Sequence, residues 1–391
     1  MSSKEVLILS GESSGELYGA LLAKELLRRW PDLEIYGIGG ERMEATGVKL
    51  LGRIGHAFGL VEAISAIKNI RKNFRAVVEY LKKRRPQVVV LIDYPDFNIR
   101  VGEIAKRLGA RVLYYVSPQV WAWRKNRKYR IRDLAEKIAV VLPFEEEIYR
   151  SIGADVEFVG HPVTEEMEGL EKLSRQQIRE SLGISEDRPV FTFLLGSRPS
   201  EVKRLLPLME ELAEELLKPS FNTGGSAPEV LMPLAPNLQL DLKDLNKIEK
   251  FGVKILPPFL NQWPEVSSSL VALKASDMAI AASGTVVFQA GLLGIPTIVV
   301  YRLSKLTYHI ARLIVDVKYI SIPNMLLGRE VFPELIQDKA RLEIVMANIK
   351  RLMSEETRKE IRDSLKSLKE VFSGKRPSER VASMIEGLAG W

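Results

Sequence analysis

The stretch Val88-Val-Val-Leu-Ile-Asp-Tyr-Pro-Asp-Phe-Asn98 decides the fold class of this chain. Its first five residues form an unbroken apolar run, which is typical of a strand buried on both faces of a parallel sheet. Two acids and a proline end the run, and helical periodicity follows over residues 99–108. The stretch therefore predicts a strand followed directly by a helix, the unit from which parallel α/β sheets are built.

The same alternation of strand and helix extends along the chain in both directions. In the first half we expect strands at residues 6–10, 34–38, 88–92, 112–115, 137–141 and 155–159, with helices such as 17–29 between them. The pattern restarts with a helix over 174–183, followed by strands at 190–195, 229–234, 253–256, 278–281 and 296–300. The sequence thus predicts an α/β fold of two Rossmann-like halves joined near residues 161–174, with an active cleft between them.

The domain limits follow from this alternation. We expect an N-terminal domain over residues 1–168 and a C-terminal domain over 169–372. The last segment, about 373–391, carries an apolar helical face, and we expect it to pack on the first domain or on a partner subunit.

Composition narrows the classes of function. The chain has 391 residues, of which 46% are hydrophobic and 27% charged, as in ordinary soluble proteins. It has no cysteine and three histidines, which excludes a thiol nucleophile and argues against a His-rich zinc centre. The net charge of +7 suits a phosphorylated substrate, an anionic membrane or nucleic acid. No signal peptide and no apolar run of about 20 residues is present, so we expect a cytoplasmic protein with at most peripheral membrane contact.

The turn at residues 10–16, Ser-Gly-Glu-Ser-Ser-Gly-Glu, follows the first predicted strand. Its glycines and serines can bring backbone N–H groups and a helix N-terminus close to an anion or a sugar. Glu12 and Glu16 would repel a phosphate, so the turn suits sugar hydroxyls better. A purely structural turn capped by Ser13 or Ser14 is the alternative.

Acidic residues follow the strand at 88–92. Ligands of open α/β sheets collect at the carboxyl ends of the strands, where Asp93 and Asp96 lie. One carboxylate could cap the helix that begins near Asn98 while the other faces the cleft as a base. Both could instead be structural, and a Mg²⁺ site would lack a visible third ligand.

Residues 114–132 interleave Trp121 and Trp123 with six basic residues. Aromatic rings stack on sugars and cations contact phosphates, so this segment predicts a cleft wall followed by a basic rim. Nucleic acid is the alternative, but no nucleic-acid-binding signature accompanies the segment.

Two turns of the second half predict anion binding. In the first, Gly196 and Ser197 could cradle a phosphate while Arg198 supplies a forked cation, although an ordinary turn with a solvated arginine would have the same sequence. In the second, residues 281–289 place small and hydroxyl residues at the start of a helix, which is an anion-binding arrangement.

Residues 58–81 predict an amphipathic helix with four basic residues, Lys68, Arg71, Lys72 and Arg75, between its apolar positions. Packing of the apolar face in the core is the default interpretation. The basic side also makes this helix the best candidate for contact with anionic lipid.

Taken in order, these segments resemble the lipid-A-disaccharide synthase family of glycosyltransferases. The resemblance runs from residue 11 to about residue 337, and eight motifs occur in register. They are GESSGE (11–16), DYPDFN (93–98), YYVSPQVWAWR (114–124), LPFEEEIY (142–149), GHP (160–162), GSRPSEV (196–202), ASGT (282–285) and SIPNMLLGRE (321–330).

The resemblance implies a two-domain GT-B fold that works without a metal or another cofactor. It implies transfer of 2,3-diacylglucosamine from UDP-2,3-diacylglucosamine to 2,3-diacylglucosamine 1-phosphate, which gives a β(1→6) disaccharide and UDP. It also implies a Gram-negative source, a peripheral position on the cytoplasmic face of the inner membrane, no nucleic-acid partner, and a homodimer through the C-terminal segment.

The resemblance further implies roles for individual residues. Asp96 is the expected base, with Glu12 and Glu16 beside it. The residues expected to bind the UDP-sugar are Gly196, Ser197, Arg198, Ser283, Gly284, Thr285 and Gln289. The residues expected in the acceptor cleft are Ser14, Asn98, Trp121, Asn324 and Arg329.

Two positions depart from the family pattern. Glu16 stands where the family usually has Asp, and Gln289 stands where many such enzymes carry a ribose-binding glutamate. If Gln289 faces the ribose, Gln289→Glu should tighten UDP binding roughly fivefold, since hydrogen bonds to charged groups are the stronger ones. The alternative places Gln289 on the helix surface.

Two other functions fit the same residues. One is a GT-B enzyme or epimerase that acts on another UDP-sugar. The other is a non-enzymatic basic protein that binds membranes or RNA through residues 58–85 and 121–132.

Overall fold

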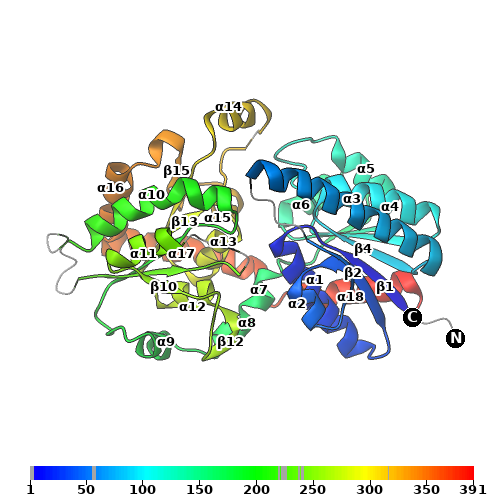
Figure 1. Ribbon diagram of the computed structural model, residues 1–391, viewed down its shortest axis with the longest axis horizontal. Helices are drawn as coiled ribbons and strands as arrows, with labels where there is room; N and C mark the ends of the chain where they lie inside the picture. The colour runs from blue at the N-terminus through cyan, green and yellow to red at the C-terminus, as the bar shows by residue number, and fades with distance from the viewer. Residues whose placement is uncertain are drawn as a thin grey trace. The chain divides into compact units, whose positions relative to one another are not determined.

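The computed structural model describes residues 4–54, 59–218, 221, 227–236, 238, 242–315 and 317–391 (Figure 1). For 59–66, 242–244 and positions 305, 306, 310 and 313 it describes the backbone alone. The chain divides into two compact units. The first holds the described residues of Met1–Glu165, Ile314–Asp316 and Gly374–Trp391, and the second holds those of Glu166–Leu313 and Val317–Ser373.

The first unit is built on a seven-stranded parallel sheet with the order β3-β2-β1-β4-β5-β6-β7. Its strands are β1 (Glu5–Leu9), β2 (Glu34–Gly39), β3 (Lys49–Arg53), β4 (Val88–Ile92), β5 (Arg111–Tyr115), β6 (Lys137–Val140) and β7 (Val156–Phe158). All residues of β1 and β4 are buried, as their apolar runs predict. The strand order reverses between β1 and β4, so the crevice at their carboxyl ends is the place where such sheets bind ligands.

The first unit has helices between its parallel strands and one further helix at the C-terminus of the chain. They are α1 (Ser13–Arg29), α2 (Glu41–Ala45), α3 (Gly59–Arg84), α4 (Pro95–Arg107), α5 (Arg127–Leu134), α6 (Pro143–Arg150), α7 (Val163–Glu166), whose last residue belongs to the second unit, and the C-terminal α18 (Pro377–Ala389).

The C-terminal helix returns to the first unit, where α18 lies beside α1 (Figure 1). Arg29 donates to the Ser383 hydroxyl at 2.9 Å and to the Glu379 carbonyl at 2.8 Å. The rings of Trp30 and Trp391 meet edge to face with their centroids 5.1 Å apart. The apolar face of the last segment is therefore covered within its own chain.

The second unit has a six-stranded parallel sheet with the order β10-β9-β8-β13-β14-β15. Its strands are β8 (Val190–Leu194), β9 (Glu229–Pro233), β10 (Lys254–Leu256), β13 (Met278–Ala282), β14 (Thr297–Tyr301) and β15 (Glu334–Ile336), and a separate hairpin joins β11 (Phe259–Leu260) and β12 (Trp263–Ser267). Its helices are α8 (Glu168–Glu171), α9 (Arg175–Ser181), α10 (Pro199–Leu216), α11 (Leu242–Lys250), α12 (Ser268–Ala275), α13 (Thr285–Leu293), α14 (Lys305–Ile314), α15 (Ile322–Leu327), the 3₁₀ turn Gln337–Lys339, α16 (Leu342–Leu352) and α17 (Glu355–Phe372).

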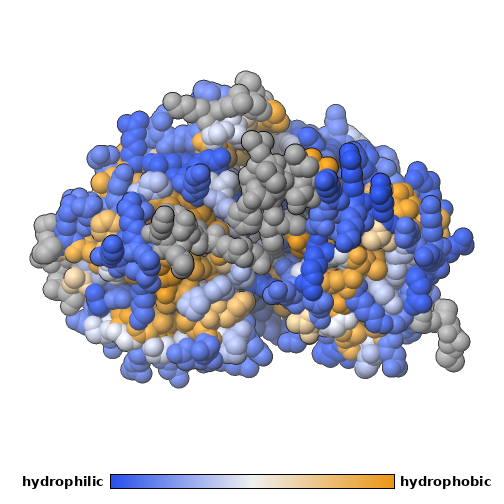
Figure 2. All heavy atoms as spheres, in the orientation of Figure 1, coloured by the Kyte–Doolittle hydropathy of each residue, from blue (hydrophilic) through white to orange (hydrophobic). Residues whose placement is uncertain are grey.

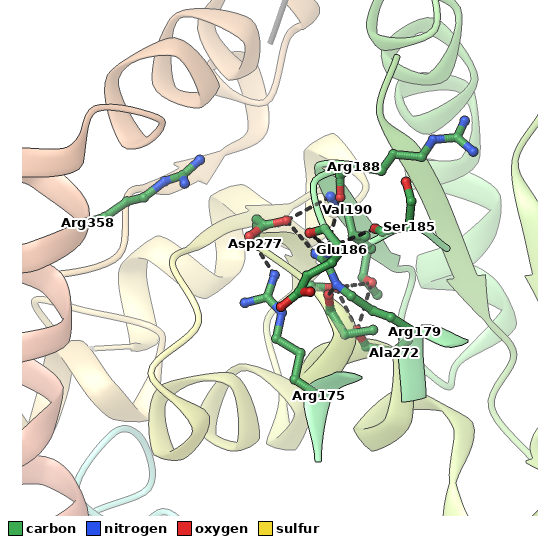
Figure 3. A network of polar contacts seen from close by, with 12 residues as sticks. Arg175, Arg179, Ser185, Glu186, Arg188, Val190, Ala272, Asp277 and Arg358 are labelled. Carbon is green, nitrogen blue, oxygen red and sulfur yellow. Dashed lines mark hydrogen bonds and ion pairs between the residues drawn. The ribbon is translucent and has the colours of Figure 1, made fainter. Parts of the chain in front are cut away.

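A polar network ties α9 to the sheet of the second unit (Figure 3). Asp277, directly before β13, accepts from Arg175 at 2.6 Å, from Arg179 at 2.8 Å and from the Val190 N–H at 2.9 Å. Burial works to raise the pKa of Asp277, but Arg175 and these hydrogen bonds outweigh it and hold the pKa below its usual range. The pairing of this half-buried carboxylate with two guanidiniums fixes where this helix docks.

The two parallel sheets confirm the predicted fold class. The predicted strands lie within one or two residues of the observed ones. The sequence did not predict the edge strands β3 and β15 or the hairpin strands β11 and β12, and α1 and α4 each begin four residues earlier than expected. Within the described ranges, no helix is both long enough and apolar enough to cross a bilayer.

Candidate functional site

The crevice of the first unit is formed where β1 and β4 end, and Asn98 braces it. The Asn98 side chain is fully buried. Its amide N donates to the carbonyls of Leu9 (3.3 Å), Ile92 (3.1 Å) and Asp93 (2.8 Å). Because that amide is committed to the backbone of both strands, Asn98 holds the crevice together. Its carbonyl oxygen has no hydrogen-bond partner in the described part of the chain.

The turn after β1 packs against the turn after β4. A Cβ added at Gly11 would lie 2.1 Å from the Cγ atom of Tyr94, so only glycine fits there. Tyr94 precedes α4 with a left-handed backbone, φ +47°, and α4 begins at Pro95. The expected carboxylate cap is wrong for this helix, because in the described structure no side chain caps it and Asp96 lies inside its first turn.

The start of α1 also differs from expectation. Glu12 is the residue before the helix, and no side-chain cap forms there in the described structure. Ser13 and the half-buried Ser14 lie in the first turn, so the alternative of a turn capped by Ser13 or Ser14 is wrong. Glu12 is exposed beside the crevice, and its role stays a prediction.

Glu16 points to a neighbouring helix. Its side chain is 5% exposed, and its Oε1 accepts the backbone N–H of Arg42 at 2.8 Å, in the first turn of α2. A Cβ on Gly40, the residue before α2, would approach Oε1 to 2.5 Å. Since a carboxylate at this place satisfies a free N–H and the helix dipole, Glu16 stabilises α2. The expected place of Glu16 in the catalytic group stays a prediction.

Asp96 lies among cations at the rim of the crevice. Its side chain is 72% exposed, whereas that of Arg127 is 12% exposed. Its Oδ1 forms ion pairs with Arg127 and, at 3.3 Å, with Arg124. Both guanidiniums lie over the ring of Trp123, at 4.6 Å for Arg124 and 5.2 Å for Arg127. The expected basic rim is therefore assembled around Asp96.

Trp121 contacts Glu145, an acid that the sequence did not single out. Its indole N–H donates to Oε1 of the buried Glu145 at 3.2 Å, and the Leu142 N–H donates to Oε2 at 3.0 Å. Burial raises the pKa of Glu145 to about 7, although these hydrogen bonds oppose the rise. The signal was present in LPFEEEIY, where a glutamate follows a helix-starting proline at the third helical position.

Backbone strain gathers at the same edge. Asp93, Tyr94, Val116 and Arg124 all have positive φ, between +45° and +59°, and they make up four of the six described non-glycine residues with this property. Such a backbone is costly for a β-branched residue such as Val116. Strained residues of this kind cluster at active sites and ligand clamps. Strain and topology thus point to one candidate site in the first unit.

The second unit has its own candidate site, where the neighbouring strands β8 and β13 end. Gly196 has a φ of +92°, which favours glycine, and Ser197 and Arg198 are exposed before α10. Arg198 lies 3.6 Å from the carboxylate of Glu201. At the start of α13, no described atom lies within 4 Å of a Cβ built on Gly284. Two helix N-termini therefore open at one edge of the sheet, which favours an anion.

Other predicted site residues contact neighbouring residues of the same chain. The Ser283 hydroxyl donates to the Ile320 carbonyl at 3.1 Å, while Thr285 begins α13. Arg329, which is expected in the acceptor cleft, is exposed in the second unit and donates to the Ser364 hydroxyl at 2.7 Å.

Asn324 has a structural place. Its Oδ1 accepts the N–H groups of Val331 (2.8 Å) and Phe332 (2.9 Å). Its Nδ2 donates to the Phe332 carbonyl (2.7 Å) and to Glu334 (2.8 Å). All four hydrogen bonds of the amide are thus made inside the unit. The expected contact of Asn324 with the acceptor stays a prediction, and the four hydrogen bonds give this residue a structural role.

Gln289 lies in the second turn of α13 and is 3% exposed, so its alternative placement on the helix surface is wrong. Its Nε2 donates to Oε2 of Glu166 at 2.8 Å, and its Oε1 is buried without a partner among the described residues. Glu166, at the end of α7, is half-buried and was not predicted. Its carboxylate lies 123 residues away along the chain, and the sequence offered no local signal for it.

Among the described residues, no group of three or more His, Cys, Asp or Glu side chains has the geometry to hold a metal ion.

Known structures share this architecture. A putative UDP-N-acetylglucosamine 2-epimerase from Listeria monocytogenes matches with a TM-score of 0.67 at 12% identity, covering 99% of this chain and 97% of that one. CalG4, the calicheamicin glycosyltransferase, matches with a TM-score of 0.61 at 13% identity, covering 100% of this chain and 99% of that one. These likenesses concern the fold, which is GT-B as expected.

Known sequences identify the family. The family model for lipid-A-disaccharide synthetase matches residues 6–385. The lipid-A-disaccharide synthase of Syntrophus aciditrophicus (strain SB) is 37% identical over 390 residues, 98% of this chain and 97% of the relative. That of Myxococcus xanthus (strain DK1622) is 39% identical over 351 residues, 89% of this chain and 87% of the relative. The chain therefore belongs to the lipid-A-disaccharide synthetase family of glycosyltransferases.

Proposed function

We propose that this chain is an inverting glycosyltransferase. It transfers 2,3-diacylglucosamine from UDP-2,3-diacylglucosamine to the 6-hydroxyl of 2,3-diacylglucosamine 1-phosphate, and it releases UDP. The observation that carries the proposal is the family match over residues 6–385, which spans both units and both candidate sites. The alternatives, another UDP-sugar enzyme or a non-enzymatic basic protein, are not favoured by this match.

The second unit takes the UDP of the donor. The pyrophosphate needs N–H donors and positive charge, which the starts of α10 and α13 and the exposed Arg198 offer. These groups also stabilise the charge that develops on UDP as the glycosidic bond breaks, and they do so without a metal.

The first unit takes the acceptor and supplies the base. An α-linked donor gives a β product, so the acceptor hydroxyl attacks from the face opposite to UDP and loses its proton to one base. Asp96 is that base. Its ion pairs with Arg124 and Arg127 orient the carboxylate, and the same two cations suit the 1-phosphate of the acceptor.

Membrane contact runs along α3. Ile67 is 52% exposed and Ile70 is 42% exposed, and they alternate with the exposed Lys68 and Arg71. Hydrophilic side chains cover this region of α3 in Figure 2. Apolar side chains flanked by cations are typical of a helix that rests on anionic lipid. The position on the cytoplasmic face of the inner membrane is what the family resemblance implies, and α3 would be the part of the chain that contacts the lipid. A homodimer through the C-terminal segment stays a prediction.

The product tests the proposed function. The chain is incubated with both acylated substrates, with and without EDTA, and the product is characterised by mass spectrometry and by proton coupling at the new anomeric carbon. We expect a tetra-acylated β-linked disaccharide 1-phosphate, formed equally well in EDTA. An α-linked product, an epimerised UDP-sugar or a requirement for added Mg²⁺ would contradict the proposal.

A further inference from the structure

Glu145 is a buried acid to which the proposed function gives no role. It is the third residue of α6 and is 2% exposed. Its Oε2 accepts the N–H of Leu142, the residue before the helix, at 3.0 Å. This bond completes the start of α6, and a glutamine at the same position would serve it equally well. Burying a carboxylate where an amide suffices is costly, so the helix start does not by itself explain a glutamate here.

The second carboxylate oxygen of Glu145 binds another segment of the first unit. Its Oε1 accepts the indole N–H of Trp121 at 3.2 Å. The half-buried ring of Trp121 also meets the ring of Phe144 edge to face, with centroids 5.2 Å apart. Trp121 belongs to loop 116–126, which connects β5 to α5. Glu145 therefore links the start of α6 to this loop.

Loop 116–126 has a strained backbone on both sides of Trp121. Val116 has a φ of +59° and Arg124 has a φ of +50°. Residues in such conformations persist only where the surrounding structure holds them. The hydrogen bond from Trp121 to Glu145 is a contact that fixes the loop between its two strained positions.

The same loop reaches the expected base. Arg124 follows Trp121 by three residues, and its guanidinium lies 3.3 Å from Oδ1 of Asp96. That guanidinium also lies over the ring of Trp123, 4.6 Å from the ring centre. A displacement of Trp121 would therefore move Arg124, which is one of the two cations that orient Asp96.

We propose that Glu145 is a positioning residue for the transfer step. Through the indole of Trp121 it holds loop 116–126 in the conformation in which Arg124 orients the carboxylate of Asp96. This assignment rests on the proposed function, because it takes Asp96 to be the base. Glu145 lies in the first unit, whereas we place UDP in the second. Loss of the contact should therefore lower turnover and leave the affinity for UDP unchanged.

Glu145→Gln separates the two contacts of the side chain. The single oxygen of the amide can accept only one of the two N–H groups, and we expect it to keep the shorter bond to Leu142. The contact with Trp121 is then lost while the start of α6 stays bonded. Trp121→Phe removes the same hydrogen bond from the side of the loop. Glu147→Gln is the matched control, since Glu147 is an exposed glutamate on the same helix.

Steady-state kinetics with both acylated substrates and calorimetric titration of UDP test the assignment. We expect Glu145→Gln to lower kcat roughly tenfold to a hundredfold, with the Kd of UDP unchanged and the control equal to wild type. Trp121→Phe should cause a similar loss. The double variant, Glu145→Gln with Trp121→Phe, should lose no more than either single variant, because both changes remove one interaction.

Nuclear magnetic resonance follows the contact itself. The resonance of the Trp121 indole N–H is identified by its absence from Trp121→Phe. It should shift in Glu145→Gln but not in the control, and in the wild type it should exchange slowly with solvent.

The outcomes separate the two proposals. Transfer by the wild type with an unchanged kcat in Glu145→Gln overturns the positioning role and leaves the proposed function intact. Losses that multiply in the double variant also overturn it, since Trp121 would then act directly on the acceptor. Rapid exchange of the Trp121 indole N–H in the wild type overturns it without any variant of Glu145. A wild-type chain that transfers no sugar contradicts the proposed function itself, and the positioning role with it.

Discussion

Replacing Gln289 by glutamate should destabilise the second unit and weaken UDP binding, the reverse of the tightening expected from the sequence alone. The substitution turns the 2.8 Å hydrogen bond to Glu166 into a contact between two carboxylates. Like unit charges ~4 Å apart repel by about 4 kcal/mol at an effective dielectric constant near 20. Rearrangement of the two side chains will relieve part of this repulsion. We therefore expect the free energy of unfolding of the second unit to fall by about 2–4 kcal/mol.

The loss of folding stability in Gln289→Glu should be larger at high pH than at low pH. The two carboxyls of the variant cannot both ionise easily, so the pKa of one of them rises in the folded state above its unfolded value of about 4.3. A raised folded pKa means that stability is fully present below the unfolded pKa and is lost as the pH rises through the folded pKa. The variant should therefore lie close to wild type at pH 5 and well below it at pH 8.

A charge exchange provides the control. Glu166→Gln combined with Gln289→Glu moves the carboxylate to α13 and the amide to α7, which restores one charge and one hydrogen bond. Thermal unfolding of the four proteins at pH 5 and pH 8 measures the coupling. At pH 8 we expect Gln289→Glu to lower the unfolding midpoint of the second unit by about 5–10 °C, and the double variant to recover most of it. The reasoning is refuted if Gln289→Glu matches wild type at pH 8, or if the exchange recovers nothing.

Three further predictions follow from the first unit. Asp96→Asn should keep the fold and UDP binding but lower turnover by roughly 10²–10⁴, and a variant that retains more than about a tenth of the rate shows that Asp96 is not the base. Replacing the exposed Ile67 and Ile70 by serine should reduce binding to vesicles containing anionic phospholipid, with the unfolding midpoint unchanged; a lowered midpoint would instead place this face in the core. Burial lowers the pKa of His161 to about 3, so folding stability should fall as the pH drops below about 6.5, by up to ~1.4 kcal/mol per pH unit. The unfolding free energy is measured by urea titration at several pH values between about 4.5 and 6.5. It should fall less steeply with decreasing pH in His161→Gln than in the wild type, and an equal dependence on pH would contradict this origin.

The fold could be predicted because its central strands are continuous apolar runs. Val88–Ile92 is buried at every residue, and a run of that kind has few other placements. The edge strands carry no such signal, since β3 (Lys49–Arg53) has no fully buried residue and β15 has only three residues. Their pairing depends on the neighbouring strand, which is a tertiary effect.

The candidate site could be predicted only in part, because residue type and motif position do not show which partner a side chain will meet. Glu16 lies in a predicted binding turn, yet it bonds to the backbone of α2. Asn324 lies in a motif, yet its amide is used up by the chain that follows α15. Glu166 accepts a hydrogen bond from Gln289, which lies 123 residues away in the sequence, so no local pattern around Glu166 could indicate this contact.

Acceptor-dependent release of UDP tests the central claim most directly. Purified chain is given UDP-2,3-diacylglucosamine alone, with 2,3-diacylglucosamine 1-phosphate, or with glucosamine 1-phosphate that lacks acyl chains, and UDP is measured over time. The account predicts rapid UDP release only when the acylated acceptor is present, and its loss in Asp96→Asn. Release of UDP at the same rate without any acceptor, or no release with both substrates present, would contradict it.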